Sequence, residues 1–326
     1  MYPYLYRLSA LLPLIASTIV PSLCQAQTTY PNRAIHFITP FPPGGSLDPL
    51  TRMSAQKLSE KWGVPIIVEN RPGANTIIGT NAVAKSLPDG YTILVAGNPH
   101  VVNPSLFPTP YDAIKDFTGV ATIARSRQVL IVNPSLPVLN LKGLIALAKS
   151  KPGQLTFGSS GVGNTNHLAG ELFGSITGTK MLHIPYKGGG PAIIDLISGQ
   201  LQLSFHVPVS VIPHIKNKRL KALAITGKTR ALALPEVLTF EEAGLPEFEI
   251  SGWTGLFAPA NTPKEIVEKI AGEMARILIM PEIIERLSNQ GLEPFISNSE
   301  QFNALLKMDM AKYAKIIKDA NIKVEN

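Results

Sequence analysis

The sequence predicts an α/β protein whose chain forms two lobes, each built around its own β-sheet. Short apolar segments alternate with longer amphipathic segments from about residue 34 onward, which is typical of βα units. Glycine-rich turns follow three of the expected strands and fall in two separate stretches of the chain. The 326 residues suffice for two domains, since domains usually hold about 100 to 200 residues.

The first stretch of alternating segments predicts strands and helices in turn, and a largely parallel sheet. Its best-defined helix covers residues 48–62, where Leu50, Met53, Leu58 and Trp62 recur near helical spacing. The other elements expected here are strands at 35–41, 65–69 and 91–96 and a helix at 77–85.

The second stretch begins at the apolar segment 129–132 and repeats the alternation. Asn140 is expected to cap a helix that ends at Ser150. Pro191 is expected at the first position of another helix. Further elements are strands at 155–158, 182–184, 203–205 and 220–225 and a helix at about 166–176.

The last third of the chain adds a strand at 253–258 and is otherwise expected to be helical. Two capping boxes predict where helices start, because in this motif two side chains three residues apart bind the first amide groups of the helix. One box pairs Thr262 with Glu265, with Pro263 at the first helical position. The other pairs Ser297 with Glu300.

Residues 1–26 have the layout of a secretory signal peptide. Arg7 gives a positive start, an apolar segment covers 8–20, and Cys24 and Ala26 suit cleavage after Ala26. The apolar segment is shorter than the roughly 20 residues that span a bilayer. We therefore expect an exported, periplasmic protein, with an uncleaved membrane anchor as the alternative.

Cleavage there would remove Cys24, the only cysteine of the chain. The mature chain would then have no disulfide, thiol nucleophile or thiolate metal site. Lipidation of Cys24 is an alternative, which Leu23 disfavours because such sites usually carry a small residue at that position. Loss of Arg7 lowers the formal net charge from +7 to +6, and this mild positive charge favours anionic ligands. Nucleic acid is not expected as a partner, since the basic residues are spread out without aromatic residues among them.

The first candidate site is the turn between the strand 35–41 and the helix 48–62. Glycines in such a turn let backbone N–H groups approach a ligand, and a helix N-terminus favours negative charge. We therefore expect an anionic group such as a carboxylate to bind there. The alternative is a structural turn in which Asp48 only caps the helix. The candidate residues are Gly44, Gly45, Ser46 and Asp48.

Two further turns of this kind lie in the second stretch. The turn at 158–165 adds hydroxyl and amide side chains that can donate hydrogen bonds, and the turn at 186–191 leads into another expected helix. Anion-binding turns in both stretches predict one cleft that holds its ligand from both lobes. In the first stretch, Asn98 and His100 follow a strand and are further candidates. The candidates in the second stretch are Ser159, Gly163, Asn164, Thr165 and Asp195.

No enzymatic motif is complete, so neither a catalytic residue nor a metal or cofactor is expected. A nucleophile elbow at Ser160 would need glycine where Val162 stands, and a dinucleotide fingerprint would need glycine where Asn166 stands. The six histidines show no pair at metal-ligand spacing.

Two alternatives from other functional classes remain. A secreted serine hydrolase could use the turn at 158–165, although nothing in the spacing of Ser160, His183 and Asp195 supports a triad. A sensory receptor could present its ligand-bound form to a membrane signalling partner instead of a permease.

Together these motifs resemble one family, the solute-binding proteins of tripartite tricarboxylate transporters, often called the Bug or TctC-like family. One matching segment is Val-Glu-Asn-Arg-Pro-Gly-Ala at 68–74. So many segments in the same order, from about residue 30 to the C-terminus, make chance similarity implausible. The other matching segments are 40–52, 88–92, 103–106, 115–117, 167–171, 185–188, 243–246 and 255–259.

The resemblance implies a type II periplasmic-binding-protein fold, in which two crossing strands join the lobes and the ligand is enclosed between them. The first lobe would comprise residues 27–127 and 251–326, and the second residues 128–250. The implied function is a periplasmic receptor for a carboxylate, such as a dicarboxylate, an amino acid or an aromatic acid, with membrane permease subunits as partners. The ligand-binding positions carried over from the family are Gly44, Gly45, Ser46, Ser159, Gly163, Asn164, Thr165 and Asp195.

The sequence departs from the family pattern at two places. Asn75-Thr76 stand where a glycine pair is usual, and the segment 97–100 lacks the common threonine or serine. Both segments would face the far end of the ligand, so these departures bear on which carboxylate is bound.

Overall fold

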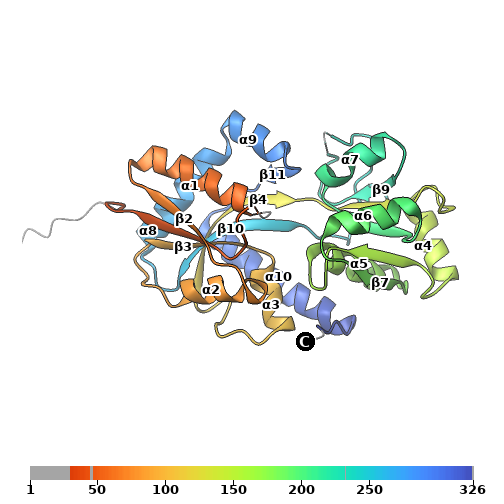
Figure 1. Ribbon diagram of the computed structural model, residues 1–326, viewed down its shortest axis with the longest axis horizontal. Coiled ribbons are helices and arrows are strands. Elements are labelled where there is room, and N and C mark those ends of the chain that lie inside the picture. Colours follow the sequence, from red (N-terminus) through yellow and green to blue (C-terminus); the bar gives the residue numbers. More distant parts are fainter. Residues whose placement is uncertain (1–29, 45–46, 232, 325–326) are drawn as a thin grey trace, which may run out of the picture.

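The computed structural model describes residues 30–44, 47–231 and 233–324, and within them the chain forms two lobes around two β-sheets (Figure 1). The expected signal peptide at 1–26 and two residues of the first turn, Gly45 and Ser46, lie outside the described residues. No helix within the described residues is both long and apolar enough to span a bilayer.

The first lobe surrounds a six-stranded sheet with the strand order β11-β4-β10-β3-β1-β2. Its strands are β1 (Ile35–Thr39), β2 (Ile66–Asn70), β3 (Thr92–Gly97), β4 (Phe117–Ser126), β10 (Gly252–Pro259) and β11 (Leu292–Pro294). Its helices are α1 (Asp48–Trp62), the short 3-10 helix η1 (Ala74–Thr76), α2 (Ile77–Ala84), α3 (Pro99–Leu106), α8 (Lys264–Leu278), α9 (Pro281–Ser288) and α10 (Ser299–Asp319). Phe37 of β1, Leu58 of α1 and Met274 of α8 belong to one buried apolar cluster, so α1 and α8 cover the same core.

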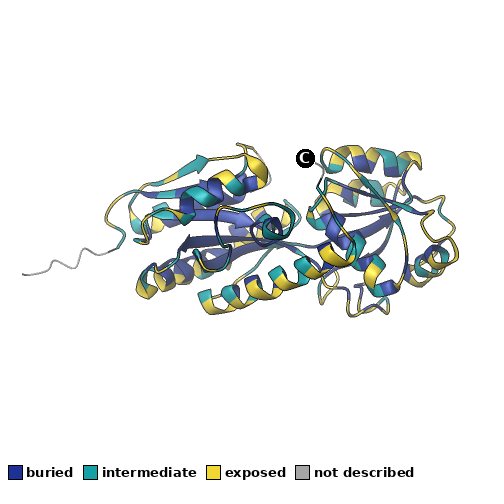
Figure 2. Ribbon diagram, turned by 90° about the horizontal axis from the view of Figure 1, so that it is seen from below, coloured by how far each residue is buried: buried dark blue, intermediate teal, exposed yellow. Residues whose placement is uncertain are grey.

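The second lobe surrounds a five-stranded sheet with the strand order β7-β6-β8-β5-β9. Its strands are β5 (Val129–Val132), β6 (Thr156–Ser159), β7 (Leu182–Pro185), β8 (Leu203–His206) and β9 (Lys221–Ile225). Its helices are α4 (Leu141–Ser150), α5 (Thr165–Thr177), α6 (Gly189–Ser198) and α7 (Pro208–Lys216). Ile131 of β5 shares a buried cluster with Leu196 of α6 and Val211 of α7. In both lobes the central strands are buried, the edge strands β2, β7 and β11 are partly exposed, and the helices expose their outer faces (Figure 2).

Both sheets are mixed, which corrects the prediction of largely parallel sheets. β1 pairs in parallel with β2 and β3, and β6 pairs in parallel with β7 and β8. In contrast, β10 is antiparallel to β3 and β4, and β5 is antiparallel to β8 and β9. The antiparallel strands adjoin the passages between the lobes, so their direction follows from the chain crossing over and not from a βα unit.

The chain passes between the lobes twice. Only Arg127 and Gln128 separate β4 from β5, and the segment between β9 and β10 leads back. Arg127 joins these two passages: its Nε lies 2.7 Å from Glu293 Oε1 of the first lobe, and its Nη2 donates to Thr229 Oγ1 of the returning segment at 3.2 Å. This side chain therefore connects the two passages to each other and to the first lobe.

The C-terminal helix α10 also connects the lobes (Figure 1). It packs against β4 and α3 of the first lobe and against α5 of the second. Tyr313, Ile316 and Ile317 of α10 share a buried apolar cluster with Phe173 of α5. The two lobes are therefore held by two passages of the chain and by one packed helix.

The cap of α10 lies one residue later than predicted. Asn298 is the N-cap, and its side chain accepts a hydrogen bond from the Gln301 amide at 2.8 Å, while the Gln301 side chain accepts from the Asn298 amide at 3.1 Å. The predicted pair Ser297 and Glu300 has the same spacing, so spacing alone does not select between them. Asn140 is confirmed as the N-cap of α4.

Two proline positions also differ from the prediction. Pro263 occupies the N-cap position of α8, and Thr262 Oγ1 donates to the Pro259 carbonyl at 2.8 Å instead of capping the helix. Helix α6 begins at Gly189, which makes Pro191 its third residue. The sequence patterns missed β4, α3 and α7, and the last two contain internal prolines.

Candidate ligand-binding cleft

A cavity of about 940 Å³ lies between the lobes and is lined by both. The first lobe contributes the turn before α1, the end of β3, parts of β4 and β10, and the segment after α9. The second contributes the turns before α5, α6 and α7. Among the described residues, no aspartate, glutamate, lysine or arginine lines it. The predicted site residues found in the lining are Gly44, Asn98, Asn164 and Thr165.

The N-termini of five described helices meet at this cavity. The N-cap residues of α1, α3, α5, α6 and α7 all belong to its lining. A helix N-terminus carries about half a positive elementary charge, together with amide N–H groups that have no partner inside the helix. The cavity therefore favours an anion without using a cationic side chain.

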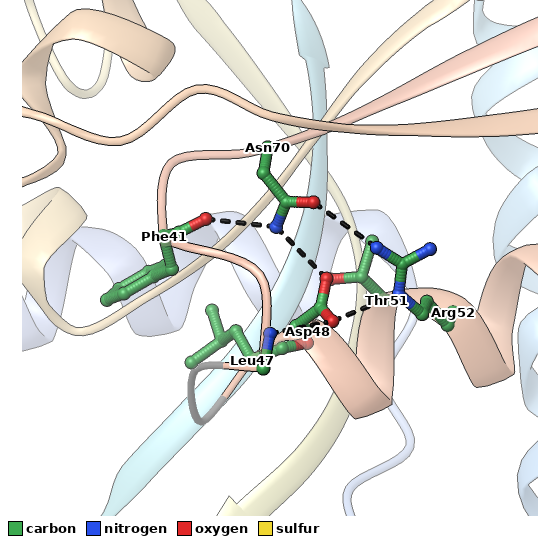
Figure 3. A network of polar contacts seen from close by, with 7 residues as sticks. Phe41, Leu47, Asp48, Thr51, Arg52 and Asn70 are labelled. Atoms are coloured by element: carbon green, nitrogen blue, oxygen red, sulfur yellow. Dashed lines mark hydrogen bonds and ion pairs between the residues drawn. The ribbon is translucent and has the colours of Figure 1, made fainter.

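The first turn is held together by Asp48, which accepts hydrogen bonds from three directions (Figure 3). Its Oδ2 accepts from the Gly44 amide at 3.1 Å and from Arg52 Nε at 3.0 Å, and its Oδ1 accepts from Asn70 Nδ2 at 3.0 Å. Asn70 Nδ2 also donates to the Phe41 carbonyl. Asp48 is absent from the cavity lining, and its hydrogen bonds fix the turn.

The contacts of Asp48 also decide its charge. Burial alone would raise the pKa of the Asp48 carboxyl, but hydrogen bonds from Arg52, Asn70 and the Gly44 amide outweigh burial and lower that pKa. The carboxyl is therefore ionised at neutral pH. The amide of Gly44, which the sequence suggested for a ligand, is instead occupied by Asp48.

Replacing Asp48 with asparagine is expected to lower the free energy of unfolding by about 1.5 to 3 kcal/mol near neutral pH, the range for hydrogen bonds to a charged group. Because the folded-state pKa of Asp48 lies below its unfolded value, this contribution is present above about pH 4 and is lost as the pH falls through the folded-state pKa. Urea unfolding of both proteins should show a difference that shrinks toward acid. The control is Asp319→Asn, at a half-exposed acid of α10, with an expected effect of at most about 0.5 kcal/mol. A pH-independent difference would contradict the prediction.

The serine-rich turn between β6 and α5 bonds mainly to itself. Ser160 Oγ donates to Asn166 Oδ1 at 2.9 Å, and Asn164 Nδ2 donates to the Ser160 carbonyl at 3.1 Å. The amide N–H groups of Thr165 and Asn166, in the first turn of α5, donate to no described residue. These two amides are therefore available to bind an anion.

Gly163 lies in the same turn but is not in the cavity lining. Its φ of 79° favours glycine, and its amide donates to His167 Nδ1 at 3.0 Å. A Cβ atom at this position would lie 2.6 Å from Leu106 Cδ1 of α3, in the other lobe. The absence of a side chain at Gly163 therefore lets the two lobes approach each other at this turn.

Ser159 is fully buried and is also outside the lining. Its Oγ lies 2.6 Å from His183 Nε2, and the His183 ring stacks on the ring of His167 at 3.7 Å between centroids. Burial, and next the neighbouring His167, lower the pKa of His183 to about 3. The pairing uses Ser159 and not Ser160, so the triad considered for a hydrolase is not formed.

Asp195 also lies outside the lining. Its Oδ2 accepts a hydrogen bond from the Tyr186 hydroxyl at 2.6 Å. Burial raises the pKa of Tyr186, and the hydrogen bond to Asp195 raises it further, to about 12. The third predicted turn instead contributes Gly188 and Gly189 to the cavity, so it takes part through its backbone.

Asn98 and His100, at the end of β3, have different environments. Asn98 lines the cavity, but its Oδ1 accepts from the Trp253 amide at 2.7 Å and its Nδ2 donates to the Tyr313 hydroxyl at 2.7 Å. His100 lies outside the lining, among Tyr111, Phe117 and Phe257. Burial lowers its pKa to about 4. Helix α3 turns this side chain into the core, so the predicted ligand contact of His100 is corrected.

Some lining residues were not predicted from the sequence. They include Trp253 on β10, His206 at the end of β8, and Asn289 and Gln290 after α9. For α7 a signal was present, because Pro208 lies two residues after the end of β8 and proline favours the first position of a helix. A single histidine at the end of an apolar segment gives no comparable signal.

Comparison with known proteins places this geometry in context. The family model described as "Tripartite tricarboxylate transporter family receptor" matches residues 50–322. Protein BugT of Bordetella pertussis is 35% identical over 322 residues, which cover 98% of this chain and 99% of BugT. A solved R. palustris protein with adipate is 33% identical, with a TM-score of 0.74, and the match covers 90% of this chain and 99% of that one. MatC from Rhodopseudomonas palustris with bound malate is 28% identical, with a TM-score of 0.69 and coverages of 88% and 100%. These similarities confirm the predicted two-lobed fold of periplasmic binding proteins.

Proposed function

The chain belongs to the tripartite tricarboxylate transporter receptor family, and from this membership we propose that it captures a small carboxylate between its lobes and delivers it to the permease of such a transporter. The family consists of periplasmic solute-binding receptors and not of enzymes. Export through the N-terminal leader, with cleavage after Ala26, is part of the proposal.

The observation that carries the proposal is the meeting of five helix N-termini at an uncharged cavity. Each N-terminus offers partial positive charge and amide N–H groups, and those of Thr165, Asn166 and Gly189 donate to no described residue. Such groups stabilise a carboxylate through charge-assisted hydrogen bonds. They need no proton transfer and no counter-ion, which suits reversible capture.

The composition of the lining also narrows the class of carboxylate. Two of the solved relatives hold adipate and malate, which are both dicarboxylates. No acidic side chain lines the described cavity, and the neighbouring Gly45 and Ser46 are uncharged, so a ligand ammonium group would have no ion-pair partner. Burying an unpaired charge is costly. We therefore favour a carboxylic acid without an amino group.

Capture requires the lobes to close, because the anion-binding groups come from both. We propose that residues 27–127 and 251–326 move as one lobe and residues 128–250 as the other. The short connection at Arg127 and Gln128 and the returning segment before β10 would serve as the hinge.

Intrinsic fluorescence offers a direct test, since the chain has two tryptophans and only Trp253 lines the cavity. A Trp62→Phe variant should show a saturable fluorescence change with dicarboxylates such as adipate and malate, and no change with amino acids. A ligand at 100 times its dissociation constant should also add about 2.7 kcal/mol to the free energy of unfolding.

Two outcomes would overturn the proposal. Tighter binding of amino acids than of every dicarboxylate would contradict the ligand class. Chemical conversion of a bound compound, detected by mass spectrometry after incubation, would contradict the assignment as a receptor.

A further inference from the structure

We propose that His206 determines ligand specificity, by donating a hydrogen bond from its imidazole N–H to a second carboxylate group of the ligand. This inference rests on the proposed function and adds a residue that neither the sequence motifs nor the family comparison assigns. It predicts that the site distinguishes dicarboxylates from monocarboxylates of the same length through this side chain.

His206 has a fixed position between two of the helix N-termini. It ends β8, a strand paired on both sides with β5 and β6, and α7 begins two residues later. The start of α6 lies against its ring, since a Cβ atom built on Gly189 would be 3.2 Å from His206 Cε1 and 3.4 Å from Nδ1. Both His206 and Gly189 line the cavity. The imidazole therefore lies beside the free amide of α6.

The imidazole of His206 also lacks a hydrogen-bond partner, within the described part of the chain, at one of its two nitrogens. The residue is only 5% exposed, and its Nε2 is buried without a hydrogen-bond partner among the described residues. Buried polar groups in folded proteins almost always have partners, so an exception beside a cavity calls for an explanation. A ligand group that accepts a hydrogen bond would supply the missing partner once the ring adjusts within the cleft.

The charge state of the ring suits this role. Burial lowers the pKa of His206 to about 4, so the imidazole is neutral at pH 7 and carries one N–H donor. A neutral donor beside a helix N-terminus adds a directed hydrogen bond without an ion pair. The cavity extends well beyond one carboxylate, and Leu47, Leu50 and Val209 in its lining suit the hydrocarbon between two such groups.

The test compares His206→Phe, which keeps an aromatic ring without a donor, with wild type. The probes are α,ω-dicarboxylates of about four to eight carbons and the matching monocarboxylates, for example adipate and hexanoate, measured by isothermal titration calorimetry. We expect the variant to bind dicarboxylates about ten- to a hundredfold more weakly, since the lost hydrogen bond involves a charged group. Affinity for the monocarboxylates should change less than about twofold.

Two further variants separate recognition from a structural role. His206→Gln, which restores an N–H donor, should recover part of the dicarboxylate affinity. His214→Phe makes the same change on α7 at a histidine outside the lining and should leave both affinities unchanged. Without ligand, His206→Phe should unfold at the same or a higher temperature, because it removes a polar group that lacks a partner.

The outcomes are distinguishable. An equal loss of affinity for dicarboxylates and monocarboxylates, or no loss for either, would overturn the role of His206 and leave the receptor function intact. Failure of the wild type to bind any member of either series would overturn the proposed function, and the role of His206 with it.

Discussion

The substitution Gly189→Val is expected to weaken carboxylate binding by about tenfold or more while leaving the unliganded fold intact. Gly189 is the first residue of α6, it lines the cavity, and its backbone does not have a positive φ that only glycine adopts readily. A Cβ atom there would lie 3.2 Å from His206 Cε1, so a branched side chain would fill the space between the α6 amide and the imidazole. Loss of one or two charge-assisted hydrogen bonds weakens binding by about tenfold to several thousandfold.

The chain offers a matched control one residue later. A Cβ atom at Gly190 would meet nothing within 4 Å, and this residue lies in the same helical turn but outside the lining. Titrations followed through Trp253 should show that Gly190→Val binds like the wild type and that Gly189→Val binds at least about tenfold more weakly. Equal affinities for the two variants would show that the start of α6 does not contact the ligand.

The second large effect concerns stability and the Asn98 side chain. Asn98→Ala is expected to lower the free energy of unfolding by about 3 kcal/mol or more, because it leaves the buried amide of Trp253 without its acceptor and removes the hydrogen bond that Asn98 donates to the Tyr313 hydroxyl. The Asn98 side chain also donates to the Ser251 carbonyl at 3.2 Å. It therefore joins β3, β10 and α10 at the base of the cleft.

Urea unfolding measures this effect, with Asn140→Ala as the comparison. Asn140 is an exposed helix cap whose loss should cost about 1 kcal/mol. If Asn98→Ala cost no more than Asn140→Ala, the hydrogen bonds of Asn98 would be dispensable for stability.

Helix positions were predictable where a short sequence pattern determines the local backbone. The bounds of α1 and the cap of α4 agree with the structure, because helical spacing and an asparagine cap act within a few residues. The sheets were less predictable, since the direction of β10 depends on where the chain crosses between lobes. Helices α3 and α7 were missed because Pro104 and Pro213 interrupt the sequence pattern without ending the helix.

For the site, the sequence predicted which turns border the cavity, but not which of their amide groups are free to bind a ligand. The glycine-rich turns do border the cavity, but the Gly44 amide binds Asp48 and the Gly163 amide binds His167. Whether an amide is free depends on side chains placed by the fold, and residue type does not reveal it. His206 was missed for the same reason, since its missing partner is a property of three-dimensional packing.

The contact of α10 with both lobes has a consequence for the strength of capture. If the lobes close on a ligand as proposed, α10 and the two chain passages would restrict their relative motion. A receptor guided in this way loses little conformational entropy when it closes. More of the free energy of the hydrogen bonds would then appear as affinity, which would let a cavity without lysine or arginine in its described lining hold a dilute anion.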